Sequence, residues 1–242
     1  MMADIHSFES LAALDGEGIR YAVFFTGCPL RCVCCHNPDT WFKSGREFDS
    51  GTLYNKLRRY KPYFKNGGGV TFSGGEPLLN AGFINEVGRL LKADGIGYAV
   101  DTSGAVKLTD DVKAAVDNAD MVILDVKYPD AEMYEKYAKG DFGVFCDFAQ
   151  YLSQTQKRVW YRTVIIPGIN DSEDMIDAYF KLISRWRMPE RYELLAFHTM
   201  GFYKYRELEI ENPLEDTEPL DKGRLRELQA YLDGLMDIED RG

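Results

Sequence analysis

The sequence predicts an α/β fold, a partial (β/α)6 barrel laid out like part of a TIM barrel, in a single domain spanning residues 1–242. Short apolar runs alternate along the chain with amphipathic stretches of about 10 to 15 residues, the pattern of parallel strands joined by right-handed crossovers. The six apolar runs are too few to close an eight-stranded barrel. Polar residues gather just after these runs, and the carboxyl ends of parallel strands are where such folds place their chemistry.

The expected strands are short apolar runs bounded by turn residues. In order they cover residues 19–25, 69–72, 97–101, 121–126, 159–166 and 192–197. The expected helices have apolar residues three and four positions apart. In order they cover residues 49–63, 81–93, 109–118, 131–137, 142–154, 172–186 and 221–236. The core of the domain is expected at about 5–205, followed by a C-terminal helical extension at about 206–242.

The composition is that of a globular protein, with 45% hydrophobic and 13% aromatic residues. A formal net charge of -10 argues against sequence-independent binding to nucleic acid and against an anionic membrane surface. No apolar run approaches the roughly 18 residues of a membrane span, and the first residues lack the pattern of a signal peptide. Five cysteines, an odd number, fit a reducing compartment. We therefore expect a cytoplasmic protein whose partners are small molecules or proteins.

Four of the cysteines lie within eight residues, directly after the first expected strand. Cys28, Cys32 and Cys35 form a C-x3-C-x2-C motif, and Cys34 lies inside it. A structural zinc site needs a fourth ligand, usually from a second pair, but the remaining cysteine, Cys146, stands alone. Thiolates favour iron–sulfur or zinc sites, and three thiolates on a four-iron cluster leave one iron open. The motif therefore predicts a reactive iron–sulfur cluster.

The other candidate side chains follow the later strands in order. They are Ser73-Gly74-Gly75-Glu76-Pro77, Asp101-Thr102, Asp125-Val126-Lys127, Arg162 with Pro167-Gly168 beyond it, and His198. The two adjacent glycines let a backbone approach a ligand closely, so that its N–H and C=O groups can bind polar atoms. Arg162 interrupts an otherwise apolar strand, which indicates an anionic partner such as a carboxylate. One rim of the barrel is thus expected to carry the chemistry.

With the cysteine motif, four further stretches resemble a known family: IHSFES from residue 5, DGEGIR from residue 15, FFTGC from residue 24 and CHNPDTW from residue 35. Together they resemble the radical S-adenosylmethionine (SAM) superfamily and, within it, the activases of glycyl radical enzymes. The resemblance covers about residues 5–205 and implies the partial barrel of the radical SAM type. It also implies a 4Fe–4S cluster on Cys28, Cys32 and Cys35, with SAM on the open iron.

The resemblance implies a function as well. Reductive cleavage of SAM yields a 5′-deoxyadenosyl radical, which takes hydrogen from a glycine Cα of a partner protein. Between His36 and Gly69 there is no cysteine, so the cysteine-rich insertion of many other activases is missing. The expected protein substrate is therefore a glycyl radical enzyme of the pyruvate formate-lyase type. The expected electron donor is a flavodoxin or a ferredoxin, and the chain is expected to be a monomer.

Residue by residue, the resemblance implies three sets of ligands. SAM is expected to contact Cys34, Cys35, His36, Gly74, Gly75, Glu76, Thr102, Asp125, Val126, Lys127, Arg162 and His198. A monovalent cation is expected at Asp101, Thr102 and Asp125, and the substrate peptide at Asp15 and His36.

The chain departs from the family pattern at three positions: Cys34 replaces the usual aromatic residue, Val126 replaces leucine, and Glu17 replaces proline. A radical SAM enzyme acting on a small molecule, as in deazapurine or cofactor synthesis, or an activase of another glycyl radical enzyme remains an alternative. From another class, a zinc-binding module would use Cys28, Cys32, Cys34 and Cys35. Four thiolates so close in sequence would strain a tetrahedral site, and such a module leaves the rim residues unexplained.

Overall fold

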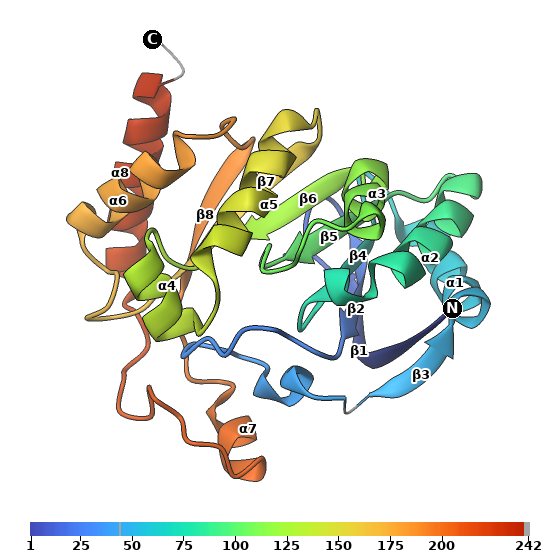
Figure 1. Ribbon diagram of the computed structural model, residues 1–242, viewed down its shortest axis with the longest axis horizontal. Coiled ribbons are helices and arrows are strands. Elements are labelled where there is room, and N and C mark those ends of the chain that lie inside the picture. Colours follow the sequence, from blue (N-terminus) through green and yellow to red (C-terminus); the bar gives the residue numbers. More distant parts are fainter. Residues whose placement is uncertain (44, 240–242) are drawn as a thin grey trace.

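The computed structural model describes residues 1–43 and 45–239, which contain one eight-stranded sheet of order β3-β1-β2-β4-β5-β6-β7-β8 (Figure 1). The strands are β1 Met2–Ala12, β2 Arg20–Phe25, β3 Arg46–Asp49, β4 Gly69–Gly74, β5 Tyr98–Thr102, β6 Met121–Asp125, β7 Arg158–Ile165 and β8 Arg191–Ala196. The α-helices are α1 Ser50–Leu57, α2 Ala81–Ala93, α3 Asp110–Asn118, α4 Ala131–Ala138, α5 Phe142–Gln154, α6 Glu173–Ile183, α7 Phe202–Glu207 and α8 Lys222–Glu239. Short 3-10 helices cover Pro38–Trp41, Arg58–Tyr63 and Pro77–Asn80.

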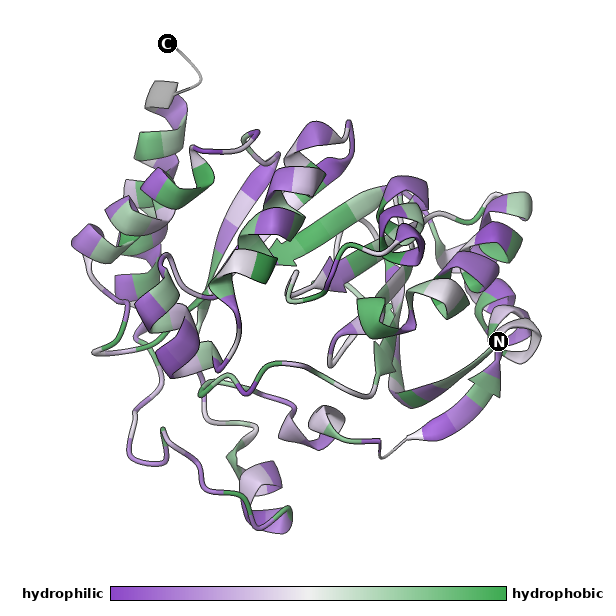
Figure 2. Ribbon diagram, in the orientation of Figure 1, coloured by the Kyte–Doolittle hydropathy of each residue, from purple (hydrophilic) through white to green (hydrophobic). Residues whose placement is uncertain are grey.

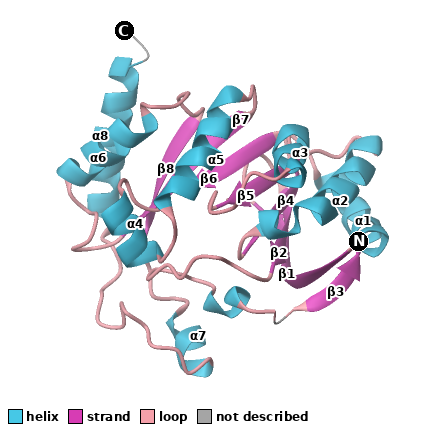
Figure 3. Ribbon diagram, viewed as in Figure 1, coloured by secondary structure: helices cyan, strands magenta, loops and turns pink. Residues whose placement is uncertain are grey.

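The six strands expected from the sequence form a continuous parallel sheet, β2-β4-β5-β6-β7-β8. The sheet does not close, because β8 lies at one end of the strand order and β1 covers the other side of β2. The predicted α/β fold with an open partial barrel is therefore confirmed. Helices connect successive parallel strands, as right-handed crossovers require (Figure 3).

Among the described residues, two strands and one α-helix were not predicted. β1 pairs antiparallel with β2 and with β3, so two antiparallel strands extend the parallel sheet beyond β2. The short helix α7 follows β8. The helix predicted at 49–63 is α-helical only through Leu57 and continues as a 3-10 helix that contains Pro62. Proline lacks an N–H and disfavours a longer α-helix at this point.

The two faces of the parallel sheet differ in character. Residues such as Phe72, Val100 and Val122 are fully buried in one large core with the apolar stripes of the helices. On the opposite, concave face a small separate cluster, Ala99, Met121 and Ile123, is apolar and buried. Figure 2 shows β6 as hydrophobic over most of its length and the helices as a mixture of hydrophilic and hydrophobic residues. The concave face therefore has room for polar side chains.

The last helix covers the free edge of β8. Leu228 and Leu232 are fully buried in the main core. The side-chain amide of Gln229 accepts a hydrogen bond from Leu194 N at 2.8 Å and donates one to Tyr192 O at 2.9 Å. An exposed strand edge otherwise presents unpaired backbone groups. No helix in the described parts of the chain has the length and apolar character that crossing a membrane requires.

Candidate active site

A cavity of about 570 Å³ opens at the carboxyl ends of the parallel strands. Most of the residues predicted for the site line it, namely Asp15, Cys28, Cys32, Cys34, Cys35, His36, Gly74, Gly75, Asp101, Asp125, Lys127, Arg162 and His198. Glu76, Thr102 and Val126 are not among its lining residues. The structure thus brings together residues on or directly after β4, β5, β6, β7 and β8 with residues of the loops before and after β2.

The cysteine loop connects β2 to the 3-10 helix Pro38–Trp41 and has no regular secondary structure (Figure 3). Helix α4 holds it from one side: Arg31 N donates to Ala138 O at 2.8 Å, and Val33 N donates to Tyr137 O at 2.9 Å. The carbonyl groups at a helix end have no partner within the helix, so they are free to accept these bonds. Tyr205 on α7 donates from its hydroxyl to Cys35 O at 3.0 Å from another side.

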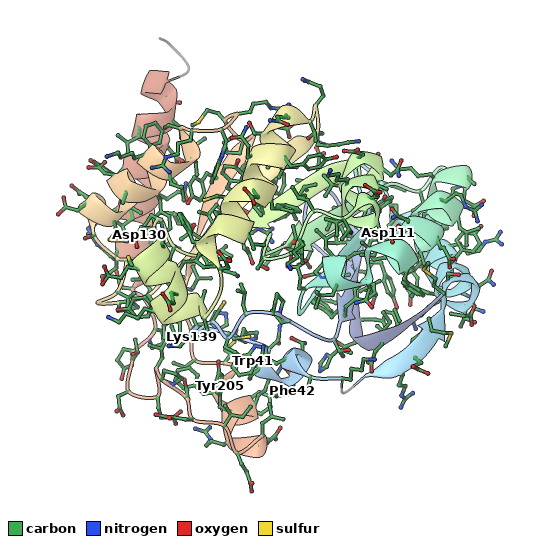
Figure 4. The ribbon with its side chains drawn as sticks, viewed as in Figure 1. Trp41, Phe42, Asp111, Asp130, Lys139 and Tyr205 are labelled. Atoms are coloured by element: carbon green, nitrogen blue, oxygen red, sulfur yellow. The ribbon has the colours of Figure 1, made fainter. Side chains whose placement is uncertain are left out.

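Aromatic residues complete this support. Figure 4 labels Trp41 and Tyr205, whose rings meet edge to face with centroids 6.0 Å apart. The Arg31 guanidinium lies over the Trp41 ring at 5.1 Å and over the Phe42 ring at 5.4 Å. Such cation–π contacts favour a fixed position of a long side chain. The loop is therefore anchored by residues from widely separated parts of the sequence.

The thiols of this loop are free and lie in an apolar environment. Burial raises the pKa of the Cys28 thiol to about 12 and that of Cys34 to about 11, and it raises the pKa of Cys32 as well. Without a metal the thiols therefore keep their protons, and metal binding would have to displace them. In the described residues, no three His, Cys, Asp or Glu side chains are grouped closely enough to hold a single metal ion.

The donor set fits an iron–sulfur cluster. Three soft thiols face one wall of a cavity wide enough for a ligand beside them. Two further groups nearby, the hydroxyls of Tyr128 and Tyr134, are buried and have no hydrogen-bond partner among the described residues. A cluster bound to different cysteines through different iron atoms would supply sulfur acceptors on this side of the protein.

Glu76 lies behind the cavity wall and is fully buried. Its carboxylate accepts hydrogen bonds from Thr102 Oγ1 at 2.7 Å, from Ser103 N at 2.9 Å and from Ser103 Oγ at 2.5 Å. It also accepts from Leu78 N at 3.1 Å. Burial raises the pKa of Glu76, while these donors oppose that rise. The side chain thus ties the loop after β4 to the loop after β5.

Gly74 and Gly75 line the cavity, but their lack of a side chain serves the protein backbone. A Cβ at Gly74 would lie 2.3 Å from Phe25 N, and Gly74 has a positive φ of 114°. A Cβ at Gly75 would lie 2.2 Å from Gly27 O. Glycine is required at both positions because the loop packs directly on the end of β2.

Val126 and Thr102 point away from the cavity for a common reason. Successive side chains of a strand lie on opposite faces, so the neighbours of the cavity-facing Asp125 and Asp101 face the core. Val126 is fully buried, and its N–H donates to Arg162 O at 2.8 Å. The Thr102 hydroxyl bonds Glu76 and accepts from Gly104 N at 3.0 Å.

Acidic and basic side chains face each other across the concave side of the sheet. Asp125 and Arg162 are paired residues of β6 and β7, and Arg162 and Glu193 are paired residues of β7 and β8. Lys127 Nζ donates to Asp125 Oδ2 at 2.6 Å. Asp101 accepts from Ser73 Oγ at 2.7 Å. Burial and the charge of Asp125 raise the pKa of Asp101 to about 7.

Arg162 connects the strands to the loop before β2. Its Nε donates to Glu193 Oε2 at 3.2 Å, and its terminal nitrogen donates to Leu14 O. The neighbouring Asp15 lines the cavity, and burial raises the pKa of its carboxyl group, opposed by Arg162 and Arg20. The loop that carries Asp15 is therefore fixed from β7.

The two histidines of the site lie together. The rings of His36 and His198 meet edge to face with centroids 4.6 Å apart, and both line the cavity. Burial, then the neighbouring His198 and Lys204, lower the pKa of His36. His36 is therefore expected to be neutral at pH 7, when its ring can accept a hydrogen bond.

Sequence reasoning missed Glu193 and Ser103, which both line the cavity. Glu193 had a readable signal, because it begins ELLAFH on the strand beside Arg162. No sequence pattern marked Ser103 as a site residue. The N-cap of the next helix, α3, is Thr109. Leu14 also lines the cavity although it lies before the first predicted strand.

Comparison with known proteins agrees with this geometry. The model of the radical SAM superfamily matches residues 22–180. The chain is 42% identical over 240 residues to the pyruvate formate-lyase-activating enzyme of Clostridium pasteurianum, covering 98% of this chain and 100% of that protein. It is 37% identical over 236 residues to the enzyme of the same name from Staphylococcus epidermidis, covering 94% of each.

A solved structure of a domain of pyruvate-formate lyase-activating enzyme from Bacteroides vulgatus shares the fold. It has a TM-score of 0.57 and 22% sequence identity, covering 70% of this chain and 95% of that one.

Proposed function

The chain belongs to the radical SAM superfamily, and from this premise we propose that it activates a glycyl radical enzyme of the pyruvate formate-lyase type. The observation that carries the proposal is the cavity itself. Its wall holds Cys28, Cys32 and Cys35, and the same cavity is lined by Asp15 and His36, the residues expected at a substrate peptide. The full-length similarity to pyruvate formate-lyase-activating enzymes supports this choice of substrate over a small molecule.

The superfamily uses a 4Fe–4S cluster and SAM, and Cys28, Cys32 and Cys35 would hold the cluster. When bound, the cluster and SAM supply a one-electron reduction that releases a carbon radical able to take hydrogen from a glycine Cα. The chain's own residues then have two tasks: to orient the reactants and to exclude water.

The polar groups on the concave face fit the charged parts of SAM. Arg162 is a forked donor suited to a carboxylate, and in this structure Glu193 and Leu14 O occupy two of its donor positions. Lys127 and Asp125 offer a donor and an acceptor 2.6 Å apart, suited to hydroxyl groups. Burial disfavours the charged ammonium, yet Asp125 and the nearby thiols raise the pKa of Lys127, so it stays protonated.

Glu76 would act on SAM indirectly. It accepts four hydrogen bonds from the loops after β4 and β5 and thereby fixes the backbone of Gly74 and Gly75 at the cavity. We assign it as a positioning residue for SAM.

Apolar side chains complete the cavity. Phe24, Val164, Leu195 and Phe197 line it beside the polar groups. They fit a reaction in which a carbon radical must be kept from solvent. A glycine of the partner protein is the substrate that passes most easily into such a space, because no side chain obstructs its Cα.

A monovalent cation is part of the proposal. Asp101 and Asp125 repel each other across neighbouring strands, and two carboxylates facing one cavity provide hard oxygen ligands. The Thr102 hydroxyl bonds Glu76, so the two aspartates would be its main side-chain ligands. We further propose that a flavodoxin or ferredoxin donates the electron and that the chain acts as a monomer in the cytoplasm, where its free thiols stay reduced.

The test is direct activation of a formate-lyase. The anaerobically reconstituted and reduced protein is mixed with SAM and a recombinant pyruvate formate-lyase, and the glycyl radical is followed by electron paramagnetic resonance. We expect one radical signal with matching amounts of 5′-deoxyadenosine. A partner with its radical-site glycine replaced by alanine serves as the control. Turnover of SAM with no glycyl signal on the intact partner would refute the proposed substrate.

A further inference from the structure

Two tyrosines beside the cysteine loop carry buried hydroxyls that lack partners. Tyr128 follows β6 and is 2% exposed, and Tyr134 lies on α4 and is 0% exposed. Neither hydroxyl has a hydrogen-bond partner in the described parts of the chain. Other buried tyrosines do: Tyr179 donates to Lys127 O at 3.0 Å, and Tyr205 donates to Cys35 O at 3.0 Å. Buried polar groups without a partner are rare and call for an explanation.

Both tyrosines belong to the same core as the cysteine loop. Cys32 is buried in that core together with Tyr128 and Tyr134. Helix α4, which carries Tyr134, also binds the loop backbone through Ala138 O and Tyr137 O. A Cβ at Gly140 would lie 2.3 Å from Leu30 Cδ2 and 2.9 Å from Tyr134 Cε1, so the Tyr134 ring and Leu30 of the loop meet at Gly140.

Thiols of the cysteine loop are among the electrostatic neighbours of the two hydroxyls. Burial raises the pKa of Tyr128, and Cys34 and Cys32 raise it further. Burial also raises the pKa of Tyr134, and Cys32 is the next contributor. Cys32, the most deeply buried of the predicted cluster ligands, and Lys127 both influence the pKa values of the two tyrosines.

We propose that Tyr128 and Tyr134 donate hydrogen bonds to sulfur atoms of a cluster held by Cys28, Cys32 and Cys35. The proposal rests on the cluster of the proposed function. A thiolate bound to iron keeps negative charge and accepts hydrogen bonds, and such bonds are one of the means by which a protein sets a cluster's potential. A donor stabilises the reduced, more negative state, so the two tyrosines should make the cluster easier to reduce.

The experiment compares Tyr128→Phe and Tyr134→Phe with the wild-type protein. A matched control is Tyr98→Phe, since Tyr98 is also fully buried but donates to Ala115 O at 3.4 Å, between β5 and α3. Each protein is reconstituted anaerobically, its iron and sulfide are measured, and the cluster is titrated against potential with paramagnetic resonance as readout. At a fixed potential we expect each of the two variants to hold about tenfold less reduced cluster. That change corresponds to a midpoint about 59 mV more negative for one electron.

Fully loaded Tyr128→Phe and Tyr134→Phe proteins with the wild-type midpoint would overturn the proposal, and so would an equal shift in Tyr98→Phe. If a phenylalanine variant does not load, 3-fluorotyrosine at the same position decides, because it keeps the hydroxyl as a stronger donor. A midpoint above that of the wild type is then expected, and an unchanged one overturns the proposal. The proposed substrate is tested separately. If the potentials shift as described but no glycyl signal forms on the partner, the substrate is wrong and the hydrogen bonds to the cluster stand.

Discussion

Replacing Asp101 by asparagine is expected to stabilise the cluster-free protein at pH 8 and to have little effect on its stability at pH 4. Burial and the charge of Asp125 raise the pKa of Asp101 to about 7, while Arg162 and the Ser73 hydroxyl oppose the rise. In the unfolded chain the same carboxyl group ionises near its ordinary pKa of 3.8. The folded protein must therefore carry an unfavourable charge above pH 7, and asparagine removes it.

The magnitude follows from the difference between the two pKa values. About three units at roughly 1.36 kcal/mol each set an upper limit of about 4 kcal/mol. Water in the open cavity screens the charge, so we expect about 2 kcal/mol. Between pH 4 and pH 7 the folded state holds a proton that the unfolded state has lost, so the free energy of unfolding falls as the pH rises through this window. Below pH 4 the contribution of Asp101 to the free energy of unfolding is fully present, and above pH 7 it is fully lost.

Urea unfolding of cluster-free wild-type and Asp101→Asn protein at several pH values between 4 and 8 measures the effect. Between pH 4 and pH 7 the free energy of unfolding of the wild type should fall, and that of Asp101→Asn should fall less. Asp216→Asn, at an exposed position that does not line the cavity, is the matched control and should keep the wild-type pH dependence. Equal pH dependence in the wild type and in Asp101→Asn would show that this carboxyl group is not held protonated.

The same measurement tests the proposed cation. A cation between two ionised carboxylates favours their charged forms, so potassium or sodium chloride should stabilise the wild type at pH 8 more than Asp101→Asn. Tetramethylammonium chloride at equal ionic strength controls for general screening. Equal effects of all three salts would count against a specific cation site.

Four further substitutions probe the loops around the cavity. Cys32→Ala should abolish iron and sulfide binding, whereas Cys34→Ala should retain both, as anaerobic metal analysis will show. Glu76→Gln places an amide N–H group against donors that need an acceptor, so it should cost about 1 to 3 kcal/mol in urea unfolding and raise the KM for SAM. Gly75→Ala puts a Cβ 2.2 Å from Gly27 O and should cost about 1 to 3 kcal/mol.

Each of these has its own contrary outcome. A cluster lost in Cys34→Ala would mean that the ligands are chosen wrongly. An unchanged KM for SAM in Glu76→Gln would reduce Glu76 to a residue that only stabilises the fold. For Gly75→Ala the control is Gly234→Ala on α8, where a Cβ would have no atom within 4 Å, and equal stability of the two variants would contradict the proposed close packing.

The parallel strands were predictable because each is an apolar run with turn residues on both sides. β1 was not, although Ala3 and Ile5 alternate with polar neighbours as a strand requires. Its pairing with β2 shifts register between Ile5 and Ser7 and again between Ser10 and Ala12. Each irregularity interrupts the alternation of buried and exposed side chains, so the strand pattern in the sequence lasts only a few residues.

The rule that polar residues follow parallel strands located the cavity but could not decide which of two neighbours faces it. At the ends of β5 and β6, Asp101 and Asp125 line the cavity, while Thr102 and Val126 lie on the other side. Side chains alternate between the two faces of a strand, so the answer follows once one residue of the strand is known to face the core. Val100 and Leu124, one residue before each aspartate, are apolar and buried, and assigning them to the core face would have placed both aspartates in the cavity.

Contacts between distant segments could not be read from the sequence, and the turn around Glu17 shows why. Glu17 stands where the family pattern has proline, and its carboxylate bonds Arg158 at 2.5 Å, a residue 141 positions away. Arg158 and Arg162 lie four residues apart on β7, so they project from the same face of the strand. One binds Glu17 and the other Leu14 O, so a single strand fixes both ends of the turn that carries Asp15. A salt bridge and a charged donor thus restrict this turn where a proline ring would restrict φ, and the restriction depends on β7 being folded beside it.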